Sequence, residues 1–321
     1  MPIKKVVICG AGFVGRHIAR AVAASSGEPS LAVQISSRNP SRIWTILHSD
    51  CDLPKDRLLP PAPVDITRPH TLNDAFKGAS VVISLVGIMH GSPADFQTIQ
   101  WKGAENVALA ARQAGARLVH FSAIGADPES HIPYMRTKGL GELSVLSVLP
   151  KATIIRPSLI FGPEDAFFNR FARLSRILPF LPVFGGGTSL FQPVYVDDIA
   201  QLVAKLCDEK VAEALGGKTI EAGGPEVLSY RDLMRLILET TRRRRPILSL
   251  PFAIGMLQGA VLERLPANLL TVTRAQVEQL KSDNIIQAKL PEGHLSLENV
   301  VSAYGLPQLR TLRNVLPTYL A

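Results

Sequence analysis

Short runs of apolar and β-branched residues alternate with segments of helical periodicity through the first half of the chain. Apolar residues occupy both faces of the run at 79–87, which is typical of a strand buried on both sides in a parallel sheet. This alternation predicts an α/β fold, a Rossmann-type doubly wound parallel sheet with helices on both faces. The expected strands are 4–10, 31–38, 62–66, 79–87, 116–126 and 152–162, and the expected helices include 14–26, 96–115 and a segment starting near 132.

The pattern changes after residue 162, where prolines interrupt the helices and the strands become short. We expect a Rossmann domain over 1–162 and a smaller C-terminal lobe over 163–321 that completes a cleft. No linker composition separates the two, so the lobe is expected to be interleaved with the first domain. The strand and helix within 190–207 are expected to return to the Rossmann sheet.

The sequence GAGFVG follows the first expected strand directly and opens the first expected helix. This context is typical of a dinucleotide-binding loop, in which Gly10 permits a tight turn, Gly12 admits a pyrophosphate and Gly15 allows close helix packing. Phe13 and Val14 complete the loop at the helix N-terminus, whose N–H groups face an anion favourably. The alternative interpretation is a glycine turn needed only for packing.

The end of the second strand indicates which dinucleotide is bound. A carboxylate there would hold the ribose 2′-hydroxyl of NADH, but the chain has Ser37 and Arg38 instead. A guanidinium suits a 2′-phosphate, so NADPH is preferred over NADH, although Arg38 stacking on adenine or facing solvent is the alternative. The remaining expected cofactor contacts are Asp65 and Ile66 near the adenine, Val86 and Gly87 near the nicotinamide ribose, and Ser158 after the sixth strand.

Tyr134 and Lys138 lie one helical turn apart, so both side chains leave the same face of the expected helix. A phenol is a poor acid or base at neutral pH, but a neighbouring ammonium, with the positive nicotinamide of the cofactor beside it, favours the phenolate and lowers its pKa. Ser122, at the end of the fifth strand, would meet them at the carboxyl edge of the sheet. These three residues are the candidate catalytic group, with Ser122 orienting a carbonyl oxygen.

The glycine loop, Ser122 and the Y-x-x-x-K pair resemble the extended or atypical short-chain dehydrogenase/reductase family. Four longer segments are similar to the nucleotide-binding accessory subunit of respiratory complex I and its bacterial relatives: SAIGADP (122–128), RPSLIFGPEDAFFNRFA (156–172), FQPVYVDDIA (191–200) and VTRAQVEQL (272–280). The resemblance implies a tightly held NADPH and a largely structural role beside other complex I subunits or quinone-linked proteins. It also implies a place in the mitochondrial matrix, peripheral to the inner membrane. No presequence is visible, so a cytoplasmic location is the alternative expectation.

Two function classes therefore remain open from the sequence. The leading one is an NAD(P)H-binding accessory or assembly protein of complex I. The competing one is an active oxidoreductase linked to quinone metabolism, with Tyr134 as the proton donor and Lys138 tuning its pKa. A sugar-nucleotide epimerase shares the fold and ranks third, because the sequence carries no separate signal for a sugar nucleotide.

The distribution of charged residues adds one candidate contact surface, at the arginine cluster 242–245. The formal net charge is +8, yet basic residues do not interleave with aromatic ones, so nucleic acid is not an expected partner. Four arginines at 242–245 precede an apolar segment that ends near 262, and this stretch is a candidate for peripheral contact with an anionic membrane. A solvated helix end followed by a core helix is the alternative. We expect no bound metal and no membrane-spanning helix.

Overall fold

The computed structural model describes residues 3–26, 29–89, 91–262, 271 and 273–320. Contacts between Cα atoms divide the chain into two units. The first unit comprises Met1–Pro157, Val196–Ala222 and Lys289–Pro307, and the second comprises Ser158–Tyr195, Gly223–Ala288 and Gln308–Ala321.

The first unit is built on an eight-stranded sheet in which every pair of neighbours is parallel. The strand order is β14-β11-β6-β5-β4-β1-β2-β3, so the chain winds outward in both directions from β1. The expected α/β class is thereby confirmed. The strands are β1 (Lys4–Cys9), β2 (Leu31–Ser37), β3 (Ala62–Pro63), β4 (Ala79–Ser84), β5 (Arg117–Phe121), β6 (Thr153–Pro157), β11 (Thr219–Ala222) and β14 (His294–Ser296).

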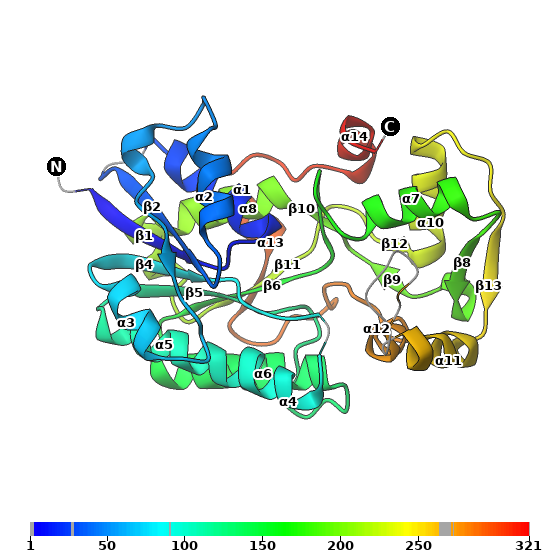
Figure 1. Ribbon diagram of the computed structural model, residues 1–321, viewed down its shortest axis with the longest axis horizontal. Helices are drawn as coiled ribbons and strands as arrows, with labels where there is room; N and C mark the ends of the chain where they lie inside the picture. The colour runs from blue at the N-terminus through cyan, green and yellow to red at the C-terminus, as the bar shows by residue number, and fades with distance from the viewer. Residues whose placement is uncertain (1–2, 27–28, 90, 263–270, 272, 321) are drawn as a thin grey trace. The chain divides into compact units, whose positions relative to one another are not determined.

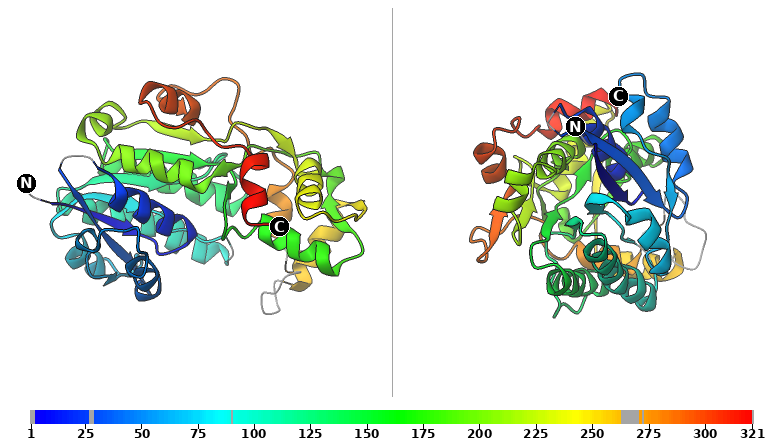
Figure 2. Two further views of the ribbon diagram at one scale, coloured as in Figure 1. Left: turned by 90° about the horizontal axis from the view of Figure 1, so that it is seen from above. Right: turned by 90° about the vertical axis from the view of Figure 1, so that its left-hand side faces the viewer.

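Helices cover both faces of this sheet, with α1 and α8 on one side and α5 and α6 on the other (Figures 1 and 2). Alternation along β1 explains the two cores. Val7 and Cys9 pack toward α5 and α6, so Val6 and Ile8 face the opposite layer. The helices of this unit are α1 (Phe13–Ala24), α2 (Ser41–His48), α3 (His70–Phe76), α4 (Pro93–Asp95), α5 (Gly103–Gln113), α6 (Pro133–Val148), α8 (Val196–Leu206), α9 (Glu209–Ala214) and α13 (Leu297–Ala303), with a 3₁₀ turn η1 (Lys55–Arg57) and a π-helical segment η2 (Phe96–Lys102).

In its described residues, the second unit has three two-stranded sheets and several helices. The pairs are β7 (Ile160–Phe161) with β10 (Val194–Tyr195), β9 (Leu190–Phe191) with β12 (Leu228–Ser229), and β8 (Leu181–Phe184) with β13 (Ile247–Leu250). Its helices are α7 (Phe168–Ile177), α10 (Tyr230–Thr240), α11 (Phe252–Leu262), α12 (Arg274–Gln279) and α14 (Leu312–Val315), with 3₁₀ turns η3 (Gly185–Gly187) and η4 (Leu316–Thr318).

The structure corrects the expectation that the strand within 190–207 returns to the large sheet. Residues 194–195 pair with β7 and residues 190–191 pair with β12, so both strands belong to the second unit. Only the helix of that segment, α8, returns and packs against α1. The large sheet is extended instead by β11 and by β14, a strand that the sequence pattern does not indicate.

None of the helices in the described ranges combines the length and the apolar character that crossing a bilayer requires.

Candidate cofactor and catalytic site

The glycine loop has the geometry that a dinucleotide requires. Gly10 has a φ of +136°, and its N–H donates to the carbonyl of Ser36 at 2.8 Å, which ties the turn to β2. A Cβ on Gly15 would lie 2.1 Å from the carbonyl oxygen of Gly10, so only glycine lets α1 start this close to the loop. A Cβ on Gly12 would meet no atom within 4 Å, so that side of the loop is open.

The N-terminus of α1 leaves its donors available. Gly12 is the N-cap residue and carries no capping side chain, and the first turn from Phe13 and Val14 contains no acidic residue. The free N–H groups and the helix dipole therefore favour an anion here. These features fit the pyrophosphate of NAD(P).

The expected adenine contacts lie at the ends of β2 and β3. Ser37 ends β2 and Arg38 follows it with an exposed side chain. Asp65 accepts hydrogen bonds from the side chain and the backbone N–H of Thr67, which lower the pKa of its carboxyl group. Ile66 is buried against α5, since a Cβ on Gly103 would lie 2.4 Å from its Cδ1 atom. Ile66 therefore shapes this end of the site from within the core.

The helix that carries Tyr134 and Lys138 packs beside the carboxyl end of β5, where Ser122 follows the strand. Lys138 Nζ donates to the carbonyl of Phe121 at 3.0 Å, which fixes α6 beside the residue that precedes Ser122. Tyr134 is one turn earlier on the same helix. A Cβ on Gly87 would lie 3.1 Å from Lys138 Nζ, so the loop after β4 reaches the same place. Val86 beside it is half-buried and packs against the core.

Burial governs the electrostatics of this group. It lowers the pKa of Lys138 to about 8, against the opposing effect of the Glu142 carboxylate, and it raises the pKa of Tyr134 to about 12. The predicted lowering of the Tyr134 pKa depends on the positive nicotinamide as well as on Lys138, and it stays a prediction. The phenol keeps its proton at neutral pH, a state that suits a proton donor rather than a base.

Gln100 is a site residue that the sequence pattern does not reveal. It lies in the π-helical segment η2, where its Nε2 donates to Thr137 Oγ1 at 3.0 Å. Its Oε1 atom is buried without a partner among the described residues, 3.4 Å from the position of a Cβ on Gly87. π-Helical turns occur often at functional sites, but the apolar periodicity of 96–115 gives no sign of one.

Ser122 also carries an unsatisfied polar atom. Its residue is 5% exposed, and its Oγ has no hydrogen-bond partner within the described part of the chain. Such orphaned buried groups are uncommon, and each calls for an explanation. Ser122 Oγ and Gln100 Oε1 are polar atoms that a nicotinamide ribose or a substrate oxygen would satisfy, so the residues present fit the cofactor.

We predict that Ser122→Ala stabilises the free protein by about 1 kcal/mol, because it removes a buried hydroxyl that has no partner. Urea unfolding followed by circular dichroism measures this change. Ser175→Ala is the matched control, since that buried hydroxyl donates to the carbonyl of Ala172 at 2.7 Å and its loss is expected to destabilise. Equal destabilisation of both variants would contradict the geometry described for Ser122.

A second prediction concerns the pH dependence of stability. The pKa of Lys138 is about 8 in the folded chain and near 10.5 when unfolded, so between these values the unfolded chain holds a proton that the folded chain has lost. The free energy of unfolding should therefore rise by up to about 1.4 kcal/mol per pH unit above pH 8. The window closes near pH 10, where Tyr134, with its raised pKa, contributes the opposite slope. Lys138→Met should abolish the rise, and an identical profile in that variant would contradict the burial of a titrating lysine.

Ser158, the last of the expected cofactor contacts, follows β6 directly in the sequence. It belongs to the second unit, where its hydroxyl lies 2.8 Å from the carbonyl oxygen of Asn284 and 2.6 Å from Asn284 Oδ1. Its role in holding a cofactor stays a prediction. The expected absence of a metal also stays a prediction. The described residues contain no group of three or more potential metal ligands.

Comparison with known proteins places this geometry in a family. The family model described as the NAD dependent epimerase/dehydratase family matches residues 6–223. Among solved structures, the dTDP-glucose 4,6-dehydratase DesIV of Streptomyces venezuelae covers 98% of this chain and 95% of its own at a TM-score of 0.73 and 17% identity. The triphenylmethane reductase of Citrobacter covers 98% and 99% at a TM-score of 0.72 and 18% identity. At these identities the two structures confirm the fold alone.

Three curated relatives are closer in sequence. NADH dehydrogenase (ubiquinone) 1 alpha subcomplex subunit 9, mitochondrial, of Arabidopsis thaliana is 31% identical over 262 residues, which are 80% of this chain and 63% of that protein. The mouse protein of the same name is matched over 58% of its length, so this chain spans less than two thirds of these relatives. The ceramide reductase of Caulobacter vibrioides is 28% identical over 80% of this chain and 77% of its own length. The glycine loop, the sheet order and the family match confirm the short-chain dehydrogenase/reductase resemblance, and the chain belongs to the NAD-dependent epimerase/dehydratase family.

Proposed function

We propose that this chain is an NAD(P)H-binding accessory or assembly protein of NADH:ubiquinone oxidoreductase, respiratory complex I. The observation that carries the proposal is the match to the mitochondrial NADH dehydrogenase subunit over 80% of this chain. The separate family match over residues 6–223 includes the glycine loop and Ser122, Tyr134 and Lys138. In this role the dinucleotide stabilises the folded chain and takes no part in a reaction. A ligand that binds only the native state stabilises it by mass action, so a bound nucleotide would hold the first unit together.

NADPH is the proposed form of the cofactor. The end of β2 offers Ser37 and the exposed guanidinium of Arg38 and no carboxylate, which favours a 2′-phosphate over a free 2′-hydroxyl. Solved neighbours carry either form, since one contains NAD and another contains NADP. NADH is the weaker candidate.

The proposed location is the matrix side of the mitochondrial inner membrane, beside other complex I subunits or quinone-linked proteins. The names of the Arabidopsis and mouse relatives include the word mitochondrial. The Caulobacter relative is bacterial, and the corresponding compartment in a bacterium is the cytoplasm.

Deletion and replacement in the chain's own organism test the accessory role. Loss of the chain should lower the amount of assembled complex I, and Tyr134→Phe should restore it as well as the original sequence does. A variant that cannot bind nucleotide should not restore it. Unchanged complex I after deletion would contradict the accessory role, and failure of Tyr134→Phe alone would indicate that turnover is needed.

An active reductase is the second candidate, favoured by the ceramide reductase relative and by the protonated phenol. Bound NADPH would supply a hydride to a carbonyl carbon. Ser122 would orient the carbonyl oxygen, Tyr134 would donate its proton to that oxygen, and Lys138 would hold the ribose hydroxyls and return a proton to the phenolate.

Steady NADPH oxidation in the presence of long-chain carbonyl lipids, quinones or nucleotide sugars tests this second candidate. We expect nucleotide binding with no sustained oxidation if the cofactor is structural. Sustained oxidation that disappears in Tyr134→Phe, with NADPH binding retained, would establish the reductase instead.

A further inference from the structure

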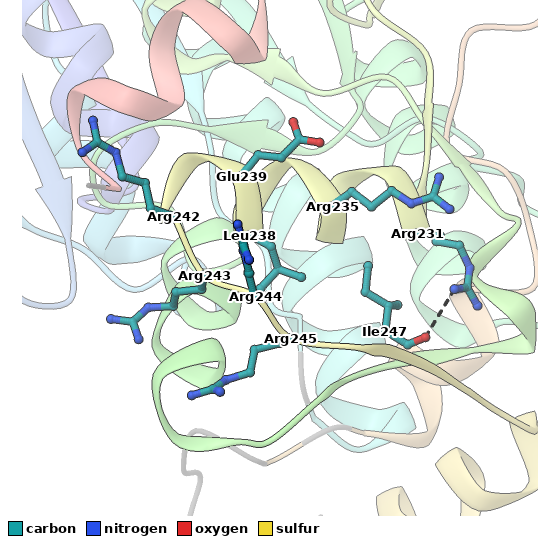
Figure 3. Close-up of a pocket in the computed structure, with 9 residues that line it drawn as sticks. All are labelled: Arg231, Arg235, Leu238, Glu239, Arg242, Arg243, Arg244, Arg245 and Ile247. Atoms are coloured by element: carbon teal, nitrogen blue, oxygen red, sulfur yellow. Dashed lines mark hydrogen bonds between the residues drawn. The ribbon is translucent and has the colours of Figure 1, made fainter.

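The second unit carries an arginine-lined hollow of about 680 Å³ between α10 and the start of β13. We propose that this surface docks on an anionic phospholipid bilayer. The proposal does not depend on association with complex I, because it concerns only residues of this unit and a lipid surface. Arg231, Arg235, Arg242, Arg243, Arg244, Arg245, Glu239, Leu238 and Ile247 line the hollow, and Figure 3 shows them.

The charge of this surface is strongly unbalanced. Among the described residues that line the hollow, six are arginines and Glu239 is the one acid. Figure 3 shows Arg243 and Arg245 extended to one side and Arg231 and Arg235 on the other. The guanidinium groups are thus spread over a surface rather than gathered on one point. A spread of cations matches a plane of phosphate headgroups better than it matches a single small anion.

Half of these arginines have an evident structural task. Arg231 donates to the carbonyls of Gly186 and Ile247, Arg235 pairs with Asp232 at 2.7 Å, and Arg245 donates to the carbonyl of Ser175. These bonds shape the hollow and hold β13 in place.

The other three arginines have no such task. Within the described residues, the structure shows no side-chain hydrogen bond or ion pair for Arg242, Arg243 or Arg244, and the buried Nε of Arg243 has no acceptor. The helix dipole favours cations after the C-terminus of α10, but that position does not supply these three side chains with anionic partners. Unpaired cations held close together repel one another, and an anionic partner removes that repulsion.

The backbone at Arg242 supports the same conclusion. Its φ of +53° is in the left-handed region, and it is the one non-glycine residue with positive φ in the described chain. The N–H of Arg242 bonds to the carbonyl of Glu239 and that of Arg243 to the carbonyl of Leu238, which closes α10 with a turn where glycine is the usual residue. Arginine thus stands where the backbone favours glycine, a departure that often marks a functional position.

Exposed aliphatic side chains beside the arginines indicate lipid rather than nucleic acid. Ile177 ends α7, two residues after the Ser175 carbonyl that accepts from Arg245, and it is 71% exposed. Leu248 follows Ile247 on β13 and is 43% exposed. A bilayer interface accepts such side chains among its acyl chains, whereas a nucleic-acid backbone gains nothing from them. The apolar helix α11 then follows β13 and exposes Ile254 and Leu257 in the same unit.

Vesicle sedimentation of the full chain tests the proposal, with vesicles of phosphatidylcholine alone and of phosphatidylcholine mixed with phosphatidylglycerol. Binding is expected only to the mixed vesicles and should weaken as salt is added. Each arginine near an anionic surface contributes about fivefold, so Arg242→Gln/Arg243→Gln/Arg244→Gln should lower the partition coefficient on the order of 100-fold. The control Arg68→Gln/Lys77→Gln/Arg112→Gln removes the same charge from exposed positions of the first unit and should change it only slightly.

Two further variants distinguish binding to lipid from binding to other polyanions and from an effect of misfolding. Ile177→Ser/Leu248→Ser should weaken vesicle binding. The same double substitution should leave the binding of a single-stranded oligonucleotide unchanged. Arg242→Gly should weaken vesicle binding while the melting temperature stays unchanged or rises, because glycine accepts the positive φ. No binding to mixed vesicles, an equal loss in both charge variants, or oligonucleotide binding without vesicle binding would each overturn the proposal.

Discussion

Gly12→Val is expected to weaken nucleotide binding strongly and to leave the fold intact. A Cβ atom on Gly12 would meet no atom within 4 Å, and the backbone there is extended with φ −114° and ψ −165°, which any residue adopts. The valine side chain would stand where the pyrophosphate approaches the loop. Loss of two charge-assisted hydrogen bonds, at about 1.5 kcal/mol each, weakens NADPH binding on the order of 100-fold. Titration calorimetry with NADPH measures the affinity, and thermal unfolding without nucleotide measures the fold.

Gly15→Ala is the matched contrast on the same loop. Its Cβ would lie 2.1 Å from a backbone oxygen, which cannot move as a flexible side chain does. We expect this smaller substitution to destabilise the free protein by about 3 kcal/mol, while the larger one at Gly12 leaves its stability unchanged. Normal NADPH affinity in Gly12→Val would contradict the assignment of this loop to the cofactor.

Arg156→Met is expected to destabilise the chain by about 3–5 kcal/mol, because it leaves buried carboxylates without their cation. Arg156 donates to Glu142 from Nε at 2.9 Å and from Nη2 at 2.6 Å, and it donates to Glu221 from Nη1 at 3.3 Å. Both glutamates are 8% exposed, and His294 lies 2.9 Å from Glu221. This cluster joins β6, β11 and β14 to α6, one turn beyond Lys138, so the substitution should also loosen the helix that carries Tyr134 and Lys138.

Arg235→Met is the control for that substitution. Arg235 pairs with Asp232 at 2.7 Å, but both side chains are largely exposed, so the loss should be no more than about 1 kcal/mol. Urea unfolding gives both values. Equal losses in the two variants would show that the buried cluster contributes no more than a surface ion pair.

Much of the first unit is predictable because each of its central strands is apolar on both faces. The apolar, β-branched composition of runs such as 4–10 and 79–87 identifies them as strands, and their alternation with helices predicts the fold class. The edges are harder to predict. β3 shrinks to two residues at Pro63, which has no N–H to donate, and β14 is a three-residue strand with a polar residue at each end.

Pairing partners are also beyond a local pattern. Val194 and Tyr195 look like a strand of the main sheet, but they pair with Ile160 and Phe161 in the second unit. The apolar composition of a strand predicts that it is buried. It does not predict which sheet supplies the neighbouring strand.

The candidate site shows the same division. Residue type and spacing bring out the glycine loop and the pair Tyr134 and Lys138, since four residues make one helical turn. The pKa of Tyr134 also depends on how deeply the ring is buried, which spacing does not report and which raises this pKa. Gln100 is missed for a related reason, because a π-helical turn inside a helical pattern leaves no mark on the periodicity.

Co-migration on a native gel tests the proposed function most directly. The chain, tagged at its C-terminus in its own organism, is resolved from detergent-solubilised membranes alongside complex I activity. The account predicts that it migrates with complex I or an assembly intermediate, that Tyr134→Phe migrates in the same way, and that Gly12→Val does not. Migration of the original chain at its own monomer or dimer mass, with no complex I band, would contradict the account.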